Sequence, residues 1–206
     1  MMNAVKTGIT QEQILATVRG MGVARSNDLQ ARGVHPQQLL RLTDSGELIR
    51  VGRGLYSLPD TDLTECQSYV EACTRFPTGT ICLLSALRFH ELTTQNPGSV
   101  WMAFDNRRGL PSDRLIDLRR ISMSGESLQA GAETHLVAGL PVRVYDLHKT
   151  IADCFKYRST VGLDVAMEAL KEAWMARRLD LNLLGQYAQV CRVQRVMQPY
   201  LEMLVI

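Results

Sequence analysis

The sequence lacks several features that would assign it to a particular class of protein. Its five cysteines form no C-x-x-C pair, and no histidine stands beside them to complete a zinc site. No apolar run approaches the roughly 18 residues of a membrane-spanning helix. The first residues also lack the cationic start and apolar stretch of an export signal. These absences predict a reduced, cytoplasmic protein with no metal and no cofactor, in which the cysteines are small buried apolar residues.

Strong net charge and internal repetition are missing as well. Lysine and arginine number 23 against 21 aspartates and glutamates, which leaves a net charge of only +2. Contact with a nucleic acid would therefore depend on local clusters of basic residues. The 206 residues can form one domain of good size or two modest ones. The clearest break in composition is SLPDTDLTE at 57–65, so we expect two domains, 1–60 and 61–206.

Residues 1–60 have the pattern of three short helices followed by a β-hairpin. The helices are expected to begin at Thr10, Ser26 and Pro36. Thr and Ser are favoured N-caps, and proline is favoured in the first helical position. The strands 48–51 and 55–58 then flank the tight turn Gly52-Arg53-Gly54. This order of elements is typical of a winged helix-turn-helix.

The third helix of a winged helix-turn-helix enters the major groove of DNA, and the hairpin reaches the flanking backbone. The pattern here turns Leu39, Leu40 and Leu42 inward. Glutamine can bond adenine, arginine can bond guanine, and the glycines of the turn let an arginine approach a phosphate. The predicted DNA-binding residues are His35, Gln37, Gln38, Arg41, Arg50 and Arg53. The alternative is a winged helix that docks a protein and carries solvated arginines.

Residues 61–206 alternate between helical and strand patterns. Helices are expected at 65–75, 81–91, 146–157, 164–178, 180–191 and 199–204, and three of them open on an aspartate cap. Strands are expected at 100–104, 118–123, 134–137 and 142–145, and Trp101 and Trp174 are expected in the core. The predicted class is α+β, with an N-terminal winged helix-turn-helix before a mixed domain. That mixed domain should have a small, mainly antiparallel sheet and a C-terminal helical bundle.

Asp146, His148, Lys149 and Asp153 lie close together in the sequence and raise the alternative of a metal-dependent nuclease. A PD-(D/E)xK nuclease needs an acidic residue two positions before its lysine, on a strand. Position 147 is Leu, and the lysine falls on a predicted helix, so the pattern fails. Lys149 and Asp153 also have the spacing of an ordinary surface ion pair.

Two interpretations of this C-terminal group stay open. With Tyr157 and Arg158, Lys149 and Asp153 could form a contact surface, or an internal polar network that includes a buried Arg–Asp pair. The densest basic group comprises Arg107, Arg108, Arg114, Arg119 and Arg120. It is either a solvated loop or an extension of the phosphate-binding surface.

Two segments resemble a known family. GVARSNDLQARGVHPQQLLRLTDSGELIRVGRGLYSLPD is similar to the N-terminal domain of the AbiEi antitoxins of type IV toxin–antitoxin systems, in which a helix ending in Leu-x-x-x-Gly-x-Leu precedes a Gly-Arg-Gly-x-Tyr hairpin. The matching residues are Leu42, Gly46, Leu48, Gly52, Arg53, Gly54 and Tyr56. VRVYDLHKTIADCFKYRSTVGLDVAMEALKEAW resembles the family's C-terminal stretch. Its matching residues are Lys149, Thr150, Asp153, Tyr157 and Arg158.

The resemblance implies an antitoxin and not an enzyme. Such a protein would bind double-stranded operator DNA and repress its own operon through the winged helix. It would counteract a nucleotidyltransferase-like toxin through residues 61–206, as part of a phage-resistance system. No membrane partner is implied, and the implied DNA-binding state is a monomer that binds repeated sites cooperatively.

Overall fold

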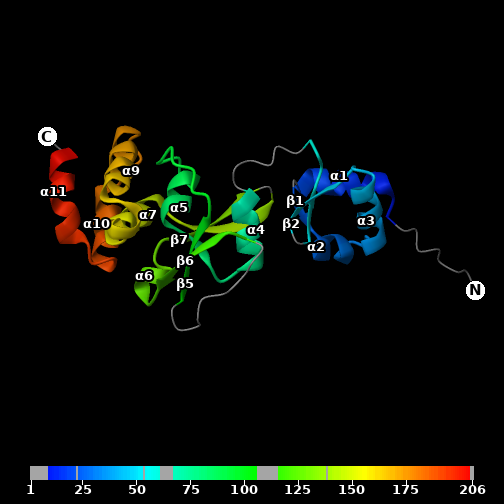
Figure 1. The fold of residues 1–206 in the computed structure, drawn as a ribbon, viewed down its shortest axis with the longest axis horizontal. Coiled ribbons are helices and arrows are strands. Elements are labelled where there is room, and N and C mark those ends of the chain that lie inside the picture. Colours follow the sequence, from blue (N-terminus) through cyan, green and yellow to red (C-terminus); the bar gives the residue numbers. More distant parts are fainter. Residues whose placement is uncertain are drawn as a thin grey trace, which may run out of the picture. The chain divides into compact units, whose positions relative to one another are not determined.

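The computed structural model describes residues 9–204 except 22, 53, 61–66, 106–115 and 138. The chain forms two compact units. The first unit comprises the described parts of Met1–Glu71 and Leu136–Pro141. The second unit comprises the described parts of Ala72–His135 and Val142–Ile206. Figure 1 shows the elements of each unit. The expected domain boundary adjoins segment 61–66, outside the described residues, and stays a prediction. No helix in the described part of the chain is long and apolar enough to cross a membrane.

The first unit is a winged helix-turn-helix, as predicted. Its elements are α1 (Gln11–Met21), β1 (Val23–Arg25), α2 (Ser26–Ala31), α3 (Pro36–Asp44), β2 (Ile49–Gly52) and β3 (Leu55–Ser57). The three strands pair antiparallel in the order β1-β3-β2, so that Ser57 faces Val23 on one side and Ile49 on the other. The strand β1 was not predicted, because it has only three residues.

Local sequence chemistry accounts for most of the helix ends in this unit. The Thr10 amide donates to the Gln13 side chain at 3.0 Å, and the Gln13 amide donates to the Thr10 hydroxyl at 3.3 Å, so the two residues form a capping box. Pro36 lies in the first turn of α3, as predicted. The prediction that Ser26 caps α2 was wrong, because Arg25 is the N-cap and the Ser26 hydroxyl accepts a hydrogen bond from Gln30.

The second unit contains most of a five-stranded mixed sheet with the order β6-β5-β4-β8-β7. Its strands are β4 (Thr80–Ile81), β5 (Val100–Asp105), β6 (Leu118–Met123), β7 (Ala132–Val137) and β8 (Leu140–Tyr145). β4 pairs antiparallel with β5 but parallel with β8, and β5 pairs parallel with β6. The predicted α+β class is confirmed, and the parallel pairs make the sheet more mixed than the sequence suggested.

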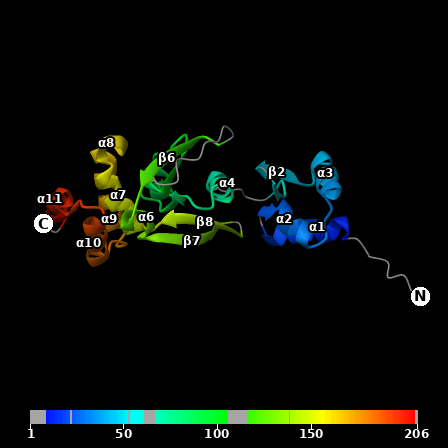
Figure 2. The same cartoon turned by 90° about the horizontal axis from the view of Figure 1, so that it is seen from below.

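Helices cover the sheet and extend beyond it at the C-terminal end. They are α4 (Gln67–Arg75), α5 (Leu83–Phe89), α6 (Glu126–Gln129), α7 (Leu147–Lys156), α8 (Arg158–Val161), α9 (Leu163–Met175), α10 (Leu181–Val190) and α11 (Gln194–Leu204). Figure 2 shows α7 to α11 gathered at one end of the β7–β8 pair, which confirms the C-terminal helical bundle. Buried apolar side chains of α5, α7, α9 and α10 join those of β5 and β6 in one core cluster.

Two of the three aspartate caps form as predicted. The Asp146 carboxylate accepts from the amides of His148 and Lys149 at the start of α7, and Asp180 caps α10 in the same way. Asp164 lies inside the first turn of α9 and is not its cap, because the N-cap position belongs to Gly162. Trp101 is in the core, but the prediction for Trp174 was wrong, since 37% of its surface is exposed.

Candidate nucleic-acid interface

The outward face of α3 combines polar, basic and apolar side chains. Gln37, Arg41 and Asp44 are exposed, while Leu39 and Leu42 are buried and hold the helix to the core of the unit. Leu40 was predicted to face inward, and this prediction was wrong because 60% of its surface is exposed. The exposed positions follow the spacing i, i+3, i+4 and i+7, which puts them on one side of an α-helix.

Arg41 is available for an external partner. It lines a hollow of about 270 Å³ together with Glu47. The Glu47 carboxylate, however, accepts hydrogen bonds from Gln11 at 2.5 Å and from Ser45 at 2.9 Å. The Arg41 side chain makes no ion pair or hydrogen bond with any other residue that the structure describes. Its guanidinium therefore keeps its hydrogen-bond donors free for an acceptor outside the domain.

His35 and Gln38 lie at the start of α3, where they organise the helix end. The Gln38 side-chain oxygen accepts from the His35 amide, and its nitrogen donates to the Ile9 carbonyl, both at 2.9 Å. Both ends of the Gln38 amide are thus occupied within the domain, and the side chain is half-buried. The His35 side chain is exposed at the N-terminal end of the helix. The predicted base contact by Gln38 would require both of these bonds to break, and the structural role of the side chain is to fix the segment before α1.

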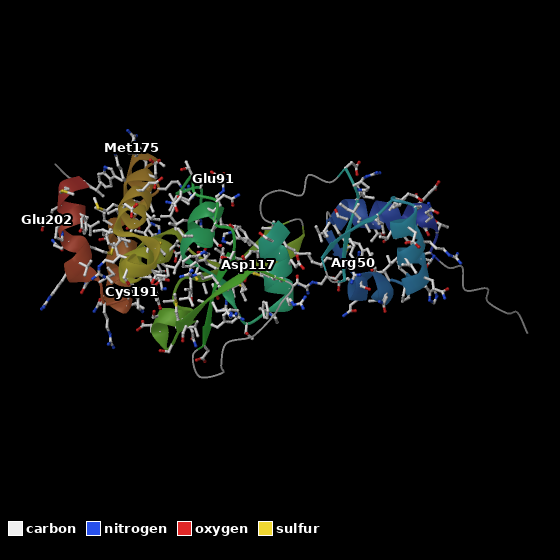
Figure 3. All side chains as sticks on the ribbon, viewed as in Figure 1. Arg50, Glu91, Asp117, Met175, Cys191 and Glu202 are labelled. Atoms are coloured by element: carbon white, nitrogen blue, oxygen red, sulfur yellow. The ribbon has the colours of Figure 1, made fainter. Side chains whose placement is uncertain are left out.

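The wing is the hairpin formed by β2 and β3. Gly54 has a φ of +72°, a left-handed conformation that favours glycine, and its carbonyl accepts from the Ser26 amide at 2.7 Å. Arg50 (labelled in Figure 3) lies on β2 with an exposed side chain. Its Nε donates to the Gly52 carbonyl at 3.3 Å, and its other guanidinium nitrogens make no hydrogen bond with the residues that the structure describes. Arg53 is outside the described residues.

The basic stretch 107–120 is only partly described. Arg107, Arg108 and Arg114 are outside the described residues. The Arg119 guanidinium lies over the Trp101 ring, 4.7 Å from its centroid, so this cation is partly engaged by a cation–π contact. The extension of a phosphate-binding surface by this stretch stays a prediction.

The C-terminal group has the geometry of an internal network. Lys149, Thr150 and Asp153 are completely buried on α7. The Lys149 ammonium forms an ion pair with Asp153 and lies 4.2 Å from the centroid of the Tyr145 ring. The Cys191 thiol donates to the other Asp153 oxygen at 3.2 Å. Of the two open interpretations, the internal network fits these residues, and its ion pair joins Asp153 to a lysine instead of an arginine.

Tyr157 and Arg158 lie at the edge of this network. The Tyr157 hydroxyl donates to the Ser122 carbonyl at 3.2 Å, which ties the end of α7 to β6. Arg158 is exposed, and its guanidinium donates to the Phe155 carbonyl at 3.0 Å. Arg158 is therefore the member of the group that a partner could reach.

Burial sets the protonation of the buried groups around Asp153. It raises the pKa of the Asp153 carboxyl, against the opposing effect of the Lys149 charge. It also raises the pKa of the Cys191 thiol to about 12 and that of the Cys154 thiol well above its usual range. These thiols stay protonated near neutral pH and are poor nucleophiles. The free cysteines at 73, 82, 154 and 191 are all buried, which confirms the prediction for them, and Cys66 is outside the described residues.

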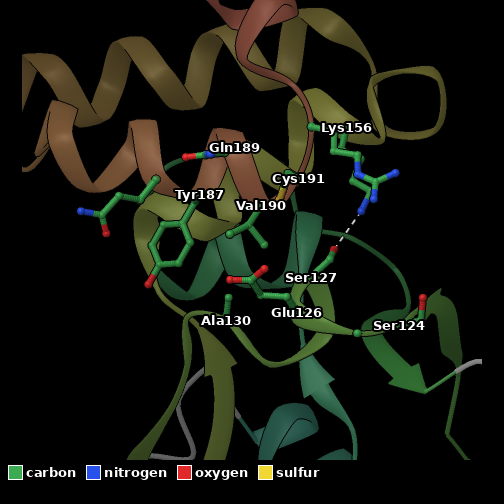
Figure 4. A pocket seen from close by; sticks show the side chains of 12 residues that line it. Ser124, Glu126, Ser127, Ala130, Lys156, Tyr187, Gln189, Val190 and Cys191 are labelled. Atoms are coloured by element: carbon green, nitrogen blue, oxygen red, sulfur yellow. Dashed lines mark hydrogen bonds between the residues drawn. The ribbon is translucent and has the colours of Figure 1, made fainter.

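The second unit also has a hollow that the sequence did not predict (Figure 4). It measures about 860 Å³ and is lined by the loop after β6, by α6, and by the ends of α7 and α10. Lys156 lies on its wall and donates to the Ser127 hydroxyl at 2.8 Å. Glu126, Tyr187 and Arg192 supply further polar groups. The lining residues come from segments far apart in the sequence, so no local motif indicates the hollow.

Comparison with known proteins supports the interpretation of the first unit. Residues 12–59 match the family described as "Transcriptional regulator, AbiEi antitoxin". This match confirms the predicted resemblance over the winged helix-turn-helix, and it supports a DNA-binding antitoxin. No curated protein matches the chain.

A solved structure shares the fold. It is the crystal structure of RV2827C protein from Mycobacterium tuberculosis, with a TM-score of 0.53 and 12% sequence identity. The similarity covers 84% of this chain and 70% of that one. At this identity the similarity concerns the fold alone.

Proposed function

We propose that this protein is a cytoplasmic, DNA-binding antitoxin of a type IV toxin–antitoxin system. In this proposal the winged helix represses the protein's own operon, and the C-terminal domain counteracts a nucleotidyltransferase-like toxin. The observation that carries the DNA-binding half is the outward face of α3, where Gln37 and an unpaired Arg41 are presented by a helix packed through Leu39 and Leu42. The family match of residues 12–59 supports the antitoxin half.

The chemistry of the α3 face suits the major groove. An arginine can donate two hydrogen bonds to guanine O6 and N7, and a glutamine can bond adenine N6 and N7. Arg41 and Gln37 have the required donors and acceptors, and they are four residues apart on one side of the helix. His35, at the N-terminal end of α3, would meet a phosphate in this proposal, because helix N-termini favour anions.

The wing contributes positive charge to DNA binding but does not read the base sequence. Arg50 and Arg53 would meet the sugar–phosphate backbone beside the groove, where a contact fixes the register of the protein on the duplex. The glycines on both sides of Arg53 allow close approach of the backbone. Because the net charge of the chain is only +2, binding depends on these few local contacts.

A reporter gene placed behind the DNA upstream of the protein's own gene tests the repressor half. The wild-type protein should lower expression, and Arg41→Ala should restore it. Arg19→Ala is the matched control, because Arg19 is an exposed arginine on α1 of the same unit. Equal repression by wild type and Arg41→Ala, at equal protein levels, would remove α3 from the proposal.

Co-expression with the adjacent gene tests the antitoxin half. The proposal requires that the adjacent gene product inhibit growth and that this protein restore growth. Restored growth in a strain that lacks the operator sequence would show that protection does not depend on repression. A toxic neighbour that is unaffected by this protein would contradict the antitoxin half.

A further inference from the structure

Leu40 is an exposed apolar side chain in the middle of a polar helix face. It is 60% exposed, whereas Leu39 and Leu42 are 1% and 4% exposed. The core of the first unit is therefore filled without it. Its neighbours on the outward face of α3 are Gln37 and Asp44 on either side along the helix, and Arg41. Neither the fold nor the contacts assigned above to Gln37 and Arg41 use this side chain.

The position of Leu40 on α3 fits a base edge next to the one that Gln37 would contact. Three residues advance an α-helix by about 4.5 Å, and the base pairs of DNA are about 3.4 Å apart. Side chains at i and i+3 lie on the same face, so Leu40 and Gln37 point into the same groove. The base nearest to Leu40 is then about one step away from the base nearest to Gln37.

We propose that Leu40 reads the C5-methyl group of a thymine in the major groove, which makes it a specificity-determining residue. This inference rests on the proposed function. Thymine is the one DNA base that presents a methyl group in the major groove, and apolar side chains recognise it by contact. The surrounding Gln37 and Arg41 would bond the polar base edges on either side.

The composition of this face favours DNA over a protein as the partner of Leu40. Protein interfaces bury contiguous apolar patches, with charged residues depleted at their centre. Leu40 is instead a single leucine among Gln37, Arg41 and Asp44, two of which are charged. The surface complementary to this face is a single thymine methyl group among base edges that form hydrogen bonds. Docking of a protein on α3 is one of the outcomes that the test below separates.

The test uses two duplexes of the DNA upstream of the protein's own gene, one natural and one with every thymine replaced by uracil. The replacement removes the methyl groups and leaves all Watson–Crick and major-groove hydrogen bonds in place. Burial of one methyl group on a leucine changes affinity about fourfold. Wild-type full-length protein should therefore bind the uracil duplex about fourfold more weakly for each thymine that Leu40 contacts.

Leu40→Ala and Leu40→Met complete the thermodynamic cycle. Leu40→Ala should bind the natural duplex about as weakly as wild type binds the uracil duplex, and uracil should weaken it no further. Leu40→Met keeps an apolar side chain and should keep most of the sensitivity to uracil. Because Leu40 is exposed and alanine favours helix, both variants should melt at the wild-type temperature.

The outcomes separate this inference from the proposed function. Equal binding of wild type to the natural and uracil duplexes, with both preferred over random DNA, would overturn the role of Leu40 and leave the repressor intact. A uracil effect of equal size in wild type and Leu40→Ala would also overturn it, because another group would then read the methyl. No binding to either duplex, together with a protein captured on α3 only when Leu40 is present, would overturn both proposals.

Discussion

Lys149 and Asp153 form the most buried ion pair that the structure describes. Both side chains are inaccessible to solvent, and Tyr145 and Cys191 make further contacts with them. Removal of two charges from water costs free energy that their mutual attraction offsets only with good geometry. The pair is therefore a structural requirement of α7, and a variant at either position acts first on folding.

The first prediction concerns this pair. Lys149→Ala should lower the free energy of unfolding by about 3–5 kcal/mol, because it leaves the Asp153 carboxylate buried without its counter-ion. Urea unfolding followed by circular dichroism measures the change. The double variant Lys149→Met with Asp153→Leu should recover most of the loss. A single variant that loses less than about 1 kcal/mol would show that water or another group replaces the lysine.

The second prediction concerns pH and His90. Burial lowers the pKa of His90 from its ordinary value of 6.5, although the hydrogen bond to the Tyr145 carbonyl opposes this. The folded state then binds fewer protons than the unfolded state, so stability is complete above pH 6.5 and is lost as the pH falls below it. The melting temperature should fall between pH 7.5 and pH 5.5, and the fall should be smaller in His90→Asn. An identical fall in both proteins would contradict this assignment.

At the scale of elements, α3 shows what the sequence could and could not predict. Its bounds and the burial of Leu39 and Leu42 follow from Pro36 and the helical period. Adjacent residues are about 100° apart around a helix, so Leu39 and Leu40 cannot both face the centre of the core. The hydrogen bond from Gln38 to the Ile9 carbonyl was not predictable, because Ile9 is distant in the sequence and lies before α1.

Strand prediction was limited in a similar way. β5 and β6 were predicted within one residue, because each is long and bounded by turn-forming residues. β1 and β4 were missed, since two or three residues become a strand only through partners elsewhere in the chain: β3 for β1, and β5 and β8 for β4. The mixed order of the sheet also depends on these distant pairings. Local sequence therefore determined the class of the fold but not the connectivity of the sheet.

The third prediction separates two roles on α3. Gln37→Ala and Arg41→Ala should each reduce the preference for the operator over random DNA, by about 1–3 kcal/mol. Gln38→Ala should instead lower stability by about 1 kcal/mol, because it removes two hydrogen bonds at the helix start, and it should leave the preference unchanged. Paired binding isotherms and thermal melts distinguish the effects. If Gln38→Ala loses the preference for the operator over random DNA and keeps its stability, Gln38 contacts a base.

At the scale of the whole molecule, the two functions should separate with the domains. The fourth prediction is that residues 61–206 alone protect cells from the toxin and do not repress the operon, because the sheet and helices of this part have their own core. Arg158→Ala should weaken protection without unfolding the domain, since Arg158 is exposed. Arg195→Ala is the matched control, because Arg195 is an exposed arginine on α11 of the same unit. Protection by 1–60 and none by folded 61–206 would reverse the assignment.

The central claim is that the winged helix binds its own operator in a sequence-specific way. It is tested most directly by fluorescence anisotropy of the full chain with the upstream duplex and with a scrambled duplex, over a range of salt concentrations. The fifth prediction is tighter binding to the upstream duplex. In a plot of the logarithm of the binding constant against the logarithm of the salt concentration, the slope should be shallower by about 0.9 for Arg53→Ala, because one phosphate contact is lost. Arg19→Ala should leave the slope unchanged. Equal affinity for the two duplexes, or an Arg53→Ala variant with wild-type slope and affinity, would contradict the account.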